Sequence, residues 1–307
     1  MILGIEIGGT KLQLVTAESA GKTGRAMIGE RFRFSVDPDQ GADGILKHIE
    51  EVIRRLNGSI QSVGVGFGGP VDALTGTVAT SHQIQGWSGF GLTEWLGERS
   101  KAATVRVEND ANVAALGEAL HGAGRGFRHV FYVTLGSGVG GGLVVDGRIY
   151  HGASPGETEI GHLRLDRYGK TVESACSGWA VDREIRQILR ELSSDSILKQ
   201  LVGEKKTGEA RFLGDAFAKG DGTARRILYR LADDLAFGLS HVVHLLHPEV
   251  IILGGGLSLI GEPLRSAVAR SLPDYIMNAF HPGPAVRLAE LGEDAVPVGA
   301  LSLTKPS

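Results

Sequence analysis

The sequence predicts an α/β fold of two domains, each with a mixed central sheet flanked by helices, around an interdomain cleft. Three observations lead to this prediction. The chain has 307 residues, about twice the length of a typical domain. Short apolar runs alternate with segments whose apolar residues have helical spacing. Glycine-rich turns follow a short apolar run at three points of the chain.

The first half opens on a β-hairpin, because two apolar runs flank the turn at Gly8 and Gly9. The strands expected in this half lie at residues 2–7, 11–16, 30–35, 62–67 and 105–108. The helices expected in this half lie at residues 44–56, 93–100 and 110–121. Either Asn109 or Asp110 is expected to cap the last of them, since both side chains can accept a bond from the first helical N–H groups.

The second half repeats the opening, with strand 129–135, a glycine turn, strand 142–145 and strand 148–150. This recurrence indicates an internal duplication of the structure, although the two sequences have diverged. The helices expected after it lie at residues 179–193, 195–203, 210–219 and 223–246, with a short last helix from Val298. A strand at 249–253 leads into the third glycine turn.

Composition excludes several classes of protein. The formal net charge is −3, from 32 Lys and Arg against 35 Asp and Glu, so the chain lacks the broad basic surface of a nucleic-acid binder. The lone cysteine, Cys176, forms no internal disulfide and supplies too few thiolates for a structural zinc cluster, which favours a reducing, cytoplasmic location. No apolar run reaches the ~18 residues of a membrane span.

The glycine turns are candidate phosphate-binding loops. They read Glu6-Ile-Gly-Gly-Thr10-Lys11, Thr134-Leu-Gly-Ser-Gly-Val-Gly-Gly-Gly142 and Leu253-Gly-Gly-Gly256. Glycine lets backbone N–H groups approach phosphate oxygens, and a Thr or Ser hydroxyl adds a donor. Simple tight turns are the alternative interpretation. Two GxGxxG matches, beginning at Gly64 and Gly136, are rejected as dinucleotide fingerprints because no helix follows either of them.

Acidic residues near these turns are candidates for chemistry. Glu6 precedes the first turn and could orient Mg²⁺ through water. Asp110, at a strand-to-helix junction, could accept a proton from a substrate hydroxyl that attacks phosphorus, although helix capping explains its position equally well. Glu159 and His162 could bind adjacent sugar hydroxyls or a metal ion.

These motifs together make the chain similar to the ROK family of sugar kinases and repressors, within the actin-like (ribonuclease H-like) ATPase superfamily. The resemblance spans nearly the whole chain and includes Glu108-Asn-Asp-Ala-Asn112 and Glu159-Ile-Gly-His162. It implies that Asp110 is the catalytic base toward a hexose hydroxyl, usually at C6. The residues expected to bind the sugar are Gly69, Gln83, Asn109, Asp110, Glu159, His162 and Glu173.

The resemblance also implies ATP as the cofactor, with Mg²⁺. The residues expected to face the phosphates are Gly8, Gly9, Thr10, Lys11, Thr134, Gly136, Ser137 and Gly138. Gly254, Gly255 and Gly256 are expected to face the adenosine. The smaller domain is expected at residues 1–119 plus 292–307, and the larger at 120–291.

Two departures from the family pattern bear on the sugar. Relatives commonly carry a zinc motif, CxCGxxGCxE, after the Gly-His pair, whereas residues 163–173 contain no cysteine, and no zinc is expected. Glu173 resembles the glutamate that ends the motif and could reach the anomeric end of the sugar. Gln83 stands where relatives have an asparagine that contacts the sugar.

The function expected from these residues is ATP-dependent phosphorylation of a hexose, with glucose as the first candidate. The alternatives are a kinase for fructose, mannose or an N-acetylhexosamine, a catalytically silent sugar sensor or scaffold, and a filament-forming or chaperone-type ATPase. Polyphosphate as the donor stays open. A DNA-binding repressor is not expected, since Gly8 follows Met1 too closely for a helix-turn-helix. The family resemblance also suggests a homodimer.

Overall fold

The computed structural model describes residues 1–18, 28–56, 60–79, 84–153, 158–190 and 196–304. By its internal contacts the chain divides into two compact units. Unit 1 comprises Met1–Gly126, Gly142–Thr158 and Glu290–Ser307, and unit 2 comprises Phe127–Gly141 and Glu159–Ala289. The domain limits expected at 119/120 and 291/292 stay a prediction.

The sheet of unit 1 has five strands in the order β3-β2-β1-β4-β8. Their bounds are β1 (Ile2–Ile7), β2 (Lys11–Ala17), β3 (Arg31–Ser35), β4 (Ser62–Phe67) and β8 (Thr104–Asn109). The β1–β2 and β2–β3 pairs are antiparallel, whereas β1, β4 and β8 run parallel. Their register aligns Ile7, Phe67 and Asn109, so the three parallel strands end side by side.

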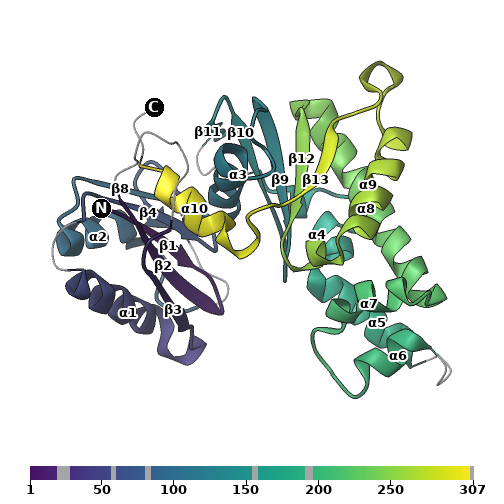
Figure 1. Cartoon of the computed structure of the whole chain (residues 1–307), viewed down its shortest axis with the longest axis horizontal. Coiled ribbons are helices and arrows are strands. Elements are labelled where there is room, and N and C mark those ends of the chain that lie inside the picture. Colours follow the sequence, from purple (N-terminus) through teal and green to yellow (C-terminus); the bar gives the residue numbers. More distant parts are fainter. Residues whose placement is uncertain (19–27, 57–59, 80–83, 154–157, 191–195, 305–307) are drawn as a thin grey trace. The chain divides into compact units, whose positions relative to one another are not determined.

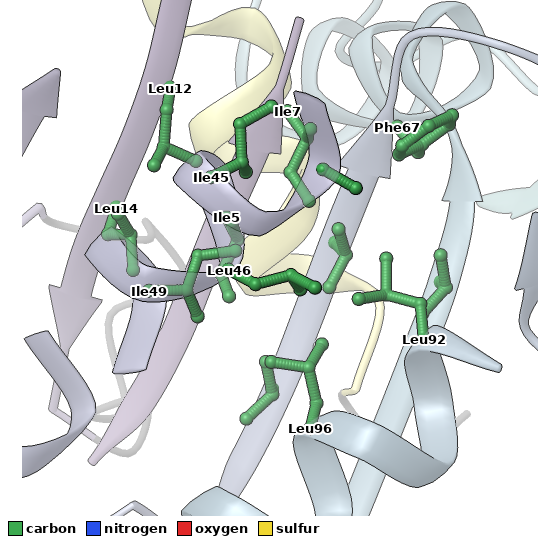
Figure 2. Packing of buried hydrophobic residues seen from close by; sticks show 14 of the residues in the cluster. Ile5, Ile7, Leu12, Leu14, Ile45, Leu46, Ile49, Phe67, Leu92 and Leu96 are labelled. Carbon is green, nitrogen blue, oxygen red and sulfur yellow. The ribbon is translucent and has the colours of Figure 1, made fainter. Parts of the chain in front are cut away.

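Helices α1 (Gly41–Arg55) and α2 (Leu92–Ser100) bury apolar side chains against this sheet. Figure 2 shows this core: Ile45, Leu46 and Ile49 of α1 lie with the side chains of β1 and β2, and Leu92 and Leu96 of α2 belong to the same cluster farther along the sheet. A second, three-stranded sheet of β5 (Val71–Asp72), β6 (Thr77–Val78) and β7 (Phe90–Gly91) was not expected from the sequence. Strands of two residues are too short to show an alternating apolar pattern.

Helices α3 (Asp110–His121) and α10 (Ala295–Ser302) pack on each other, and both contact β4. In Figure 1, α10 is the yellow helix beside β1 and β4. The last helix of the chain therefore packs on the sheet that contains its first strand. The helix begins at Ala295 rather than at the expected Val298. Pro297 consequently lies in the first turn of the helix. Backbone N–H groups in the first turn have no acceptor within the helix, so a proline there breaks no hydrogen bond.

Glycines make this packing possible. A Cβ on Gly64 would overlap the carbonyl of Ala300, lying 2.8 Å from its carbon, and one on Gly299 would lie 2.8 Å from the carbonyl carbon of Val113. A Cβ on Gly66 would meet Val296 at 2.5 Å. The first two glycines of the first GxGxxG match therefore lie in strand β4 and make room for helix packing, in agreement with the rejection of a dinucleotide motif.

Glu118 of α3 binds the segment of chain that leads into α10. Its buried carboxylate accepts hydrogen bonds from the backbone N–H groups of Ala123 (2.8 Å), Leu291 (2.8 Å) and Glu290 (3.2 Å). Burial raises the pKa of this carboxyl above its ordinary value. The hydrogen bonds from the three N–H groups lower the pKa but do not cancel the effect of burial.

The sheet associated with the second half has the order β11-β10-β9-β12-β13. Its strands are β9 (His129–Leu135), β10 (Val139–Val145), β11 (Arg148–Ile149), β12 (Val250–Gly254) and β13 (Ala285–Leu288). Chain order and pairing repeat those of the first sheet, which confirms the prediction of two mixed sheets. Strand β10 begins at Val139, three residues before the expected start, because its glycines take part in the hydrogen bonding of the sheet. Strand β13 was not expected.

The helices of unit 2 are α4 (Val172–Cys176), α5 (Gly178–Leu189), α6 (Ile197–Val202), α7 (Leu213–Ala218), α8 (Gly222–Leu246) and α9 (Glu262–Ser271). The expected helix 210–219 is instead a 3₁₀ turn, Glu209–Phe212, followed by α7. Helices α4 and α9 were not expected. In the described part of the chain, no helix is long and apolar enough to cross a membrane.

We predict that Gly64→Ala destabilises the protein by about 3 kcal/mol, because the added methyl group forces α10 off the sheet. The midpoint of thermal unfolding should fall by roughly 6–12 °C.

Gly97→Ala is the matched control, because Gly97 lies inside α2 and a Cβ there meets nothing within 4 Å. This variant should be as stable as the wild type or slightly more stable. Equal midpoints for the two variants would contradict the packing described above.

Candidate functional site

The carboxyl ends of β1, β4 and β8 bring Asp110 close to the first glycine turn. Gly8 N–H donates to the carbonyl of Lys11 at 2.9 Å, closing the hairpin, and Gly68 N–H donates to the carbonyl of Ile7 at 2.8 Å. A Cβ on Gly68 would lie 3.3 Å from Asp110 Oδ2 and 3.5 Å from the Cα of Gly8. The Asp110 carboxylate and the first glycine turn therefore both border the position that a side chain on Gly68 would occupy.

Asn109 is the N-cap of α3. Its Oδ1 accepts hydrogen bonds from the N–H groups of Ala111 (2.9 Å) and Asn112 (3.4 Å), and its Nδ2 donates to the carbonyl of Gly69 at 3.2 Å. The cap is thus Asn109 rather than Asp110, which occupies the first helical position.

Glu6 lies in a chain of charged and polar groups that the sequence did not reveal. Glu6 Oε1 is 3.2 Å from Lys11 Nζ, and Oε2 accepts a hydrogen bond from Gln13 Nε2 at 2.7 Å. Gln13 is fully buried, and its Oε1 accepts from Arg33 (2.8 Å) and Arg31 (3.2 Å). The signal that could have identified Gln13 is its position as a polar residue between Leu12 and Leu14 in an apolar strand.

A small pocket lies beside the first glycine turn. It is lined by Ile7, Gly8, Gly9, Phe67, Gly68, Ile84 and Trp87. Trp87 is fully buried, and among the described residues its Nε1 has no hydrogen-bond partner. Thr10 is exposed at the tip of the turn. Gln83 lies outside the described residues.

In unit 2 the second and third glycine turns are neighbours. Gly254 pairs with Thr134 at the ends of β12 and β9, which run parallel. Gly255 has φ +78°, and a Cβ there would lie 2.6 Å from the backbone of Leu135, so only glycine fits. Gly136 N–H donates to the carbonyl of Gly138 at 3.0 Å, and Ser137 is exposed between them. Gly256 begins the 3₁₀ helix Gly256–Ile260.

Glu159 precedes a single 3₁₀ turn, Ile160–His162, and His162 ends it; both residues are exposed. His162 N–H donates to the carbonyl of Glu159 at 3.1 Å. The turn packs on the second glycine hairpin, because the absence of a side chain at Gly161 allows it to approach the carbonyl of Val139. The turn therefore carries an exposed acid and an exposed imidazole three residues apart, next to the second glycine hairpin.

Glu173, in α4, binds the second glycine hairpin. Its Oε2 accepts a hydrogen bond from Val139 N–H at 2.9 Å. A Cβ on Gly138 would lie 2.5 Å from this same oxygen, so the hairpin needs glycine there. Gly178 N–H, at the start of α5, donates to the carbonyl of Gly136 at 2.7 Å. Two helix-start segments thus hold the hairpin, a contact that the spacing of the motifs did not predict.

Comparison with known proteins finds relatives that match nearly the whole chain, in sequence and in structure. The ROK family profile matches residues 2–307. A glucokinase of Thermotoga maritima is 31% identical, with the alignment covering 99% of this chain and 97% of the relative. An N-acetyl-D-glucosamine kinase of Histophilus somni is 28% identical, with 99% and 98% covered. The crystal structure of a ROK family glucokinase from Streptomyces griseus, in complex with glucose and AMPPNP, is 30% identical with a TM-score of 0.83, covering 98% of each chain.

We predict that Glu173→Ala loosens the second glycine hairpin, because the Val139 N–H loses a charged acceptor. A hydrogen bond to a charged group contributes about 1.5–3 kcal/mol, so amide hydrogen exchange of a peptide spanning 136–142 should accelerate roughly 10- to 100-fold. The peptide that contains Gly8 to Lys11 should exchange at the wild-type rate. Unchanged exchange at 136–142 would show that Glu173 does not hold the hairpin.

Proposed function

Because the chain belongs to the ROK family, we propose that it is an ATP-dependent hexose kinase, with glucose phosphorylated at its 6-hydroxyl as the first reaction to test. The observation that carries this proposal is the position of the Asp110 carboxylate: its Oδ2 and the Cα of Gly8, in the first glycine turn, both lie within 3.5 Å of the point where a Cβ on Gly68 would sit. A base beside a phosphate-binding turn is the arrangement that phosphoryl transfer to a hydroxyl requires.

In the proposed reaction, the sugar hydroxyl oxygen attacks the γ-phosphorus while Asp110 accepts the hydroxyl proton. The new bond joins that oxygen to phosphorus, and the bond from the γ-phosphorus to the β,γ-bridging oxygen breaks, so that ADP leaves. Catalysis of this kind depends mainly on positioning and on stabilising the charge of the phosphoryl group. Asn109 contributes by fixing the start of α3, and therefore the Asp110 carboxylate.

The glycine turns are the proposed nucleotide site. Gly8, Gly9, Thr10 and Lys11 would contact phosphates from one turn, and Thr134, Gly136, Ser137 and Gly138 from another. Gly254, Gly255 and Gly256 would contact the adenosine. The pairing of Gly254 with Thr134 supports this division, because it puts the proposed adenosine and phosphate contacts of unit 2 next to each other.

Mg²⁺ would accompany the nucleotide and neutralise phosphate charge. Both Glu6 oxygens already contact nitrogen donors, Lys11 Nζ and Gln13 Nε2. This is compatible with a cation that keeps its waters and binds phosphate, with Glu6 reaching it through water. It does not fit direct coordination by Glu6.

The proposed sugar contacts are Gly69, Gln83, Asn109, Asp110, Glu159, His162 and Glu173. The Asn109–Gly69 hydrogen bond supports a common role for those two residues. Glu173 has one oxygen engaged by Val139, so its reach toward the anomeric end of the sugar would use the other oxygen.

The resemblance also leads us to propose that the protein is cytoplasmic and forms a homodimer. Analytical ultracentrifugation tests the oligomeric state.

The identity of the hexose is the second question, since an N-acetyl-D-glucosamine kinase is among the relatives. A coupled ADP-release assay over glucose, fructose, mannose and N-acetylhexosamines decides it, and glucose should give the highest kcat/KM. Binding of a sugar with no ADP release from any of them would favour the catalytically silent sensor. ATP hydrolysis without sugar would favour the filament or chaperone ATPase. Polyphosphate is tested in the same assay by measuring the sugar phosphate.

We predict that Asp110→Asn keeps sugar binding but lowers kcat by roughly 10²- to 10⁴-fold, the range for loss of a general base. Steady-state kinetics and calorimetry of sugar binding measure the two quantities.

Asp43→Asn is the matched control, because Asp43 is an exposed aspartate in the first turn of another helix of unit 1. Its turnover should equal that of the wild type. Wild-type turnover by the Asp110 variant would eliminate this residue as the base.

A further inference from the structure

The segment between His162 and Glu173 is a closed hairpin. Val172 N–H donates to the carbonyl of Leu163 at 2.9 Å, and Leu165 N–H donates to the carbonyl of Lys170 at 2.8 Å. Arg164 and Thr171 form an antiparallel bridge between these two bonds. His162 precedes this hairpin directly and Glu173 follows it directly, so the hairpin sets how far apart their backbones lie.

Asp166 closes the turn of this hairpin. Its Oδ1 accepts hydrogen bonds from the N–H groups of Tyr168 (2.7 Å) and Lys170 (3.1 Å). Gly169 has φ +107°, a conformation that side chains oppose, so the turn needs both glycine and an acceptor. The Lys170 N–H, with smaller contributions from Tyr168 and Gly169, holds the pKa of the Asp166 carboxyl below its ordinary value. The carboxylate is therefore ionised, and accepts these bonds, at neutral pH.

The hairpin is also fixed on helix α8. Lys170 Nζ lies 2.7 Å from Asp234 Oδ1. Leu165 and Val172 pack over Gly238, where a Cβ would lie 2.6 Å from Val172 Cγ2 and 3.6 Å from Leu165 Cδ2. At the far end, Glu173 reaches the second glycine hairpin through Val139. The hairpin thus has one anchor on α8 and another on a proposed phosphate-binding turn.

We propose that Asp166 is a positioning residue for sugar binding: by closing the 163–172 hairpin it sets the separation of His162 and Glu173. This inference rests on the proposed function, because both residues are sugar ligands only under that proposal. Asp166 itself contacts no substrate and acts through the backbone of the hairpin.

The test compares Asp166→Ala and Asp166→Asn with Glu249→Ala. Glu249 is the matched control because its exposed carboxylate also accepts two backbone N–H bonds, from Arg128 and His129, where strands β9 and β12 begin. Asp166→Ala should raise the KM for the sugar about tenfold, equivalent to about 1.4 kcal/mol, with the KM for ATP changed less than about twofold. Asp166→Asn keeps one acceptor oxygen and should restore much of the loss. Glu249→Ala should leave both KM values unchanged.

Isothermal calorimetry with glucose and without nucleotide measures the same effect as a dissociation constant. An unchanged sugar Kd in Asp166→Ala, or an equal rise in both KM values, would overturn the proposal. A wild-type protein that binds glucose without phosphorylating it would instead count against the proposed kinase activity, and the calorimetric comparison would still decide the role of Asp166.

Discussion

Two helices can lie directly on the first sheet only because glycines occupy the points where the backbones cross. Gly64 of β4 lies beneath the carbonyl of Ala300 in α10, and Gly299 of α10 lies against the carbonyl of Val113 in α3. Any Cβ at these points would enter space that backbone atoms already fill, and no rotamer change could relieve the overlap. The position of α3 therefore depends on these crossings, and Asp110 begins α3.

The register of the parallel strands places the candidate site at one end of this sheet. Ile7, Phe67 and Asn109 end their parallel strands at the same level, so the first glycine turn, the Gly68–Gly69 turn and the start of α3 emerge together. Unit 2 uses glycine in the same way. Gly161 and Gly178 let two separate segments approach the second hairpin, and Gly255 lets the third turn approach Leu135. Close backbone approach thus accounts for many of the glycines near both sets of turns, beside any role in binding phosphate.

The main strands and helices could be predicted because their signals are local. The hairpin at Gly8 and Gly9 has turn chemistry, helix 110–121 has a cap residue and several alanines, and strand 129–135 is a short apolar run. By contrast, β5, β6 and β7 have two residues each and carry no periodic signal. Helix α10 begins before Pro297, a residue that single-sequence reasoning places at or before the start of a helix.

The candidate site was predictable only in part, for a related reason. Motifs identify residues such as Asp110, His162 and Glu173, but not their partners. The Gln13 amide meets Glu6 because two strands pair in one register, and Glu173 meets Val139 across 34 residues of chain. Such contacts follow from tertiary packing, which spacing along one sequence does not encode.

In the proposed reaction, Asp110 is held where a sugar hydroxyl becomes the nucleophile. A crystal structure of the wild-type protein with glucose and a non-hydrolysable ATP analogue tests it most directly. We expect one Asp110 carboxylate oxygen at about 2.6–3.2 Å from a glucose hydroxyl that faces the γ-phosphate. Glucose bound with every hydroxyl beyond hydrogen-bond reach of Asp110, and the nucleotide in place, would contradict it.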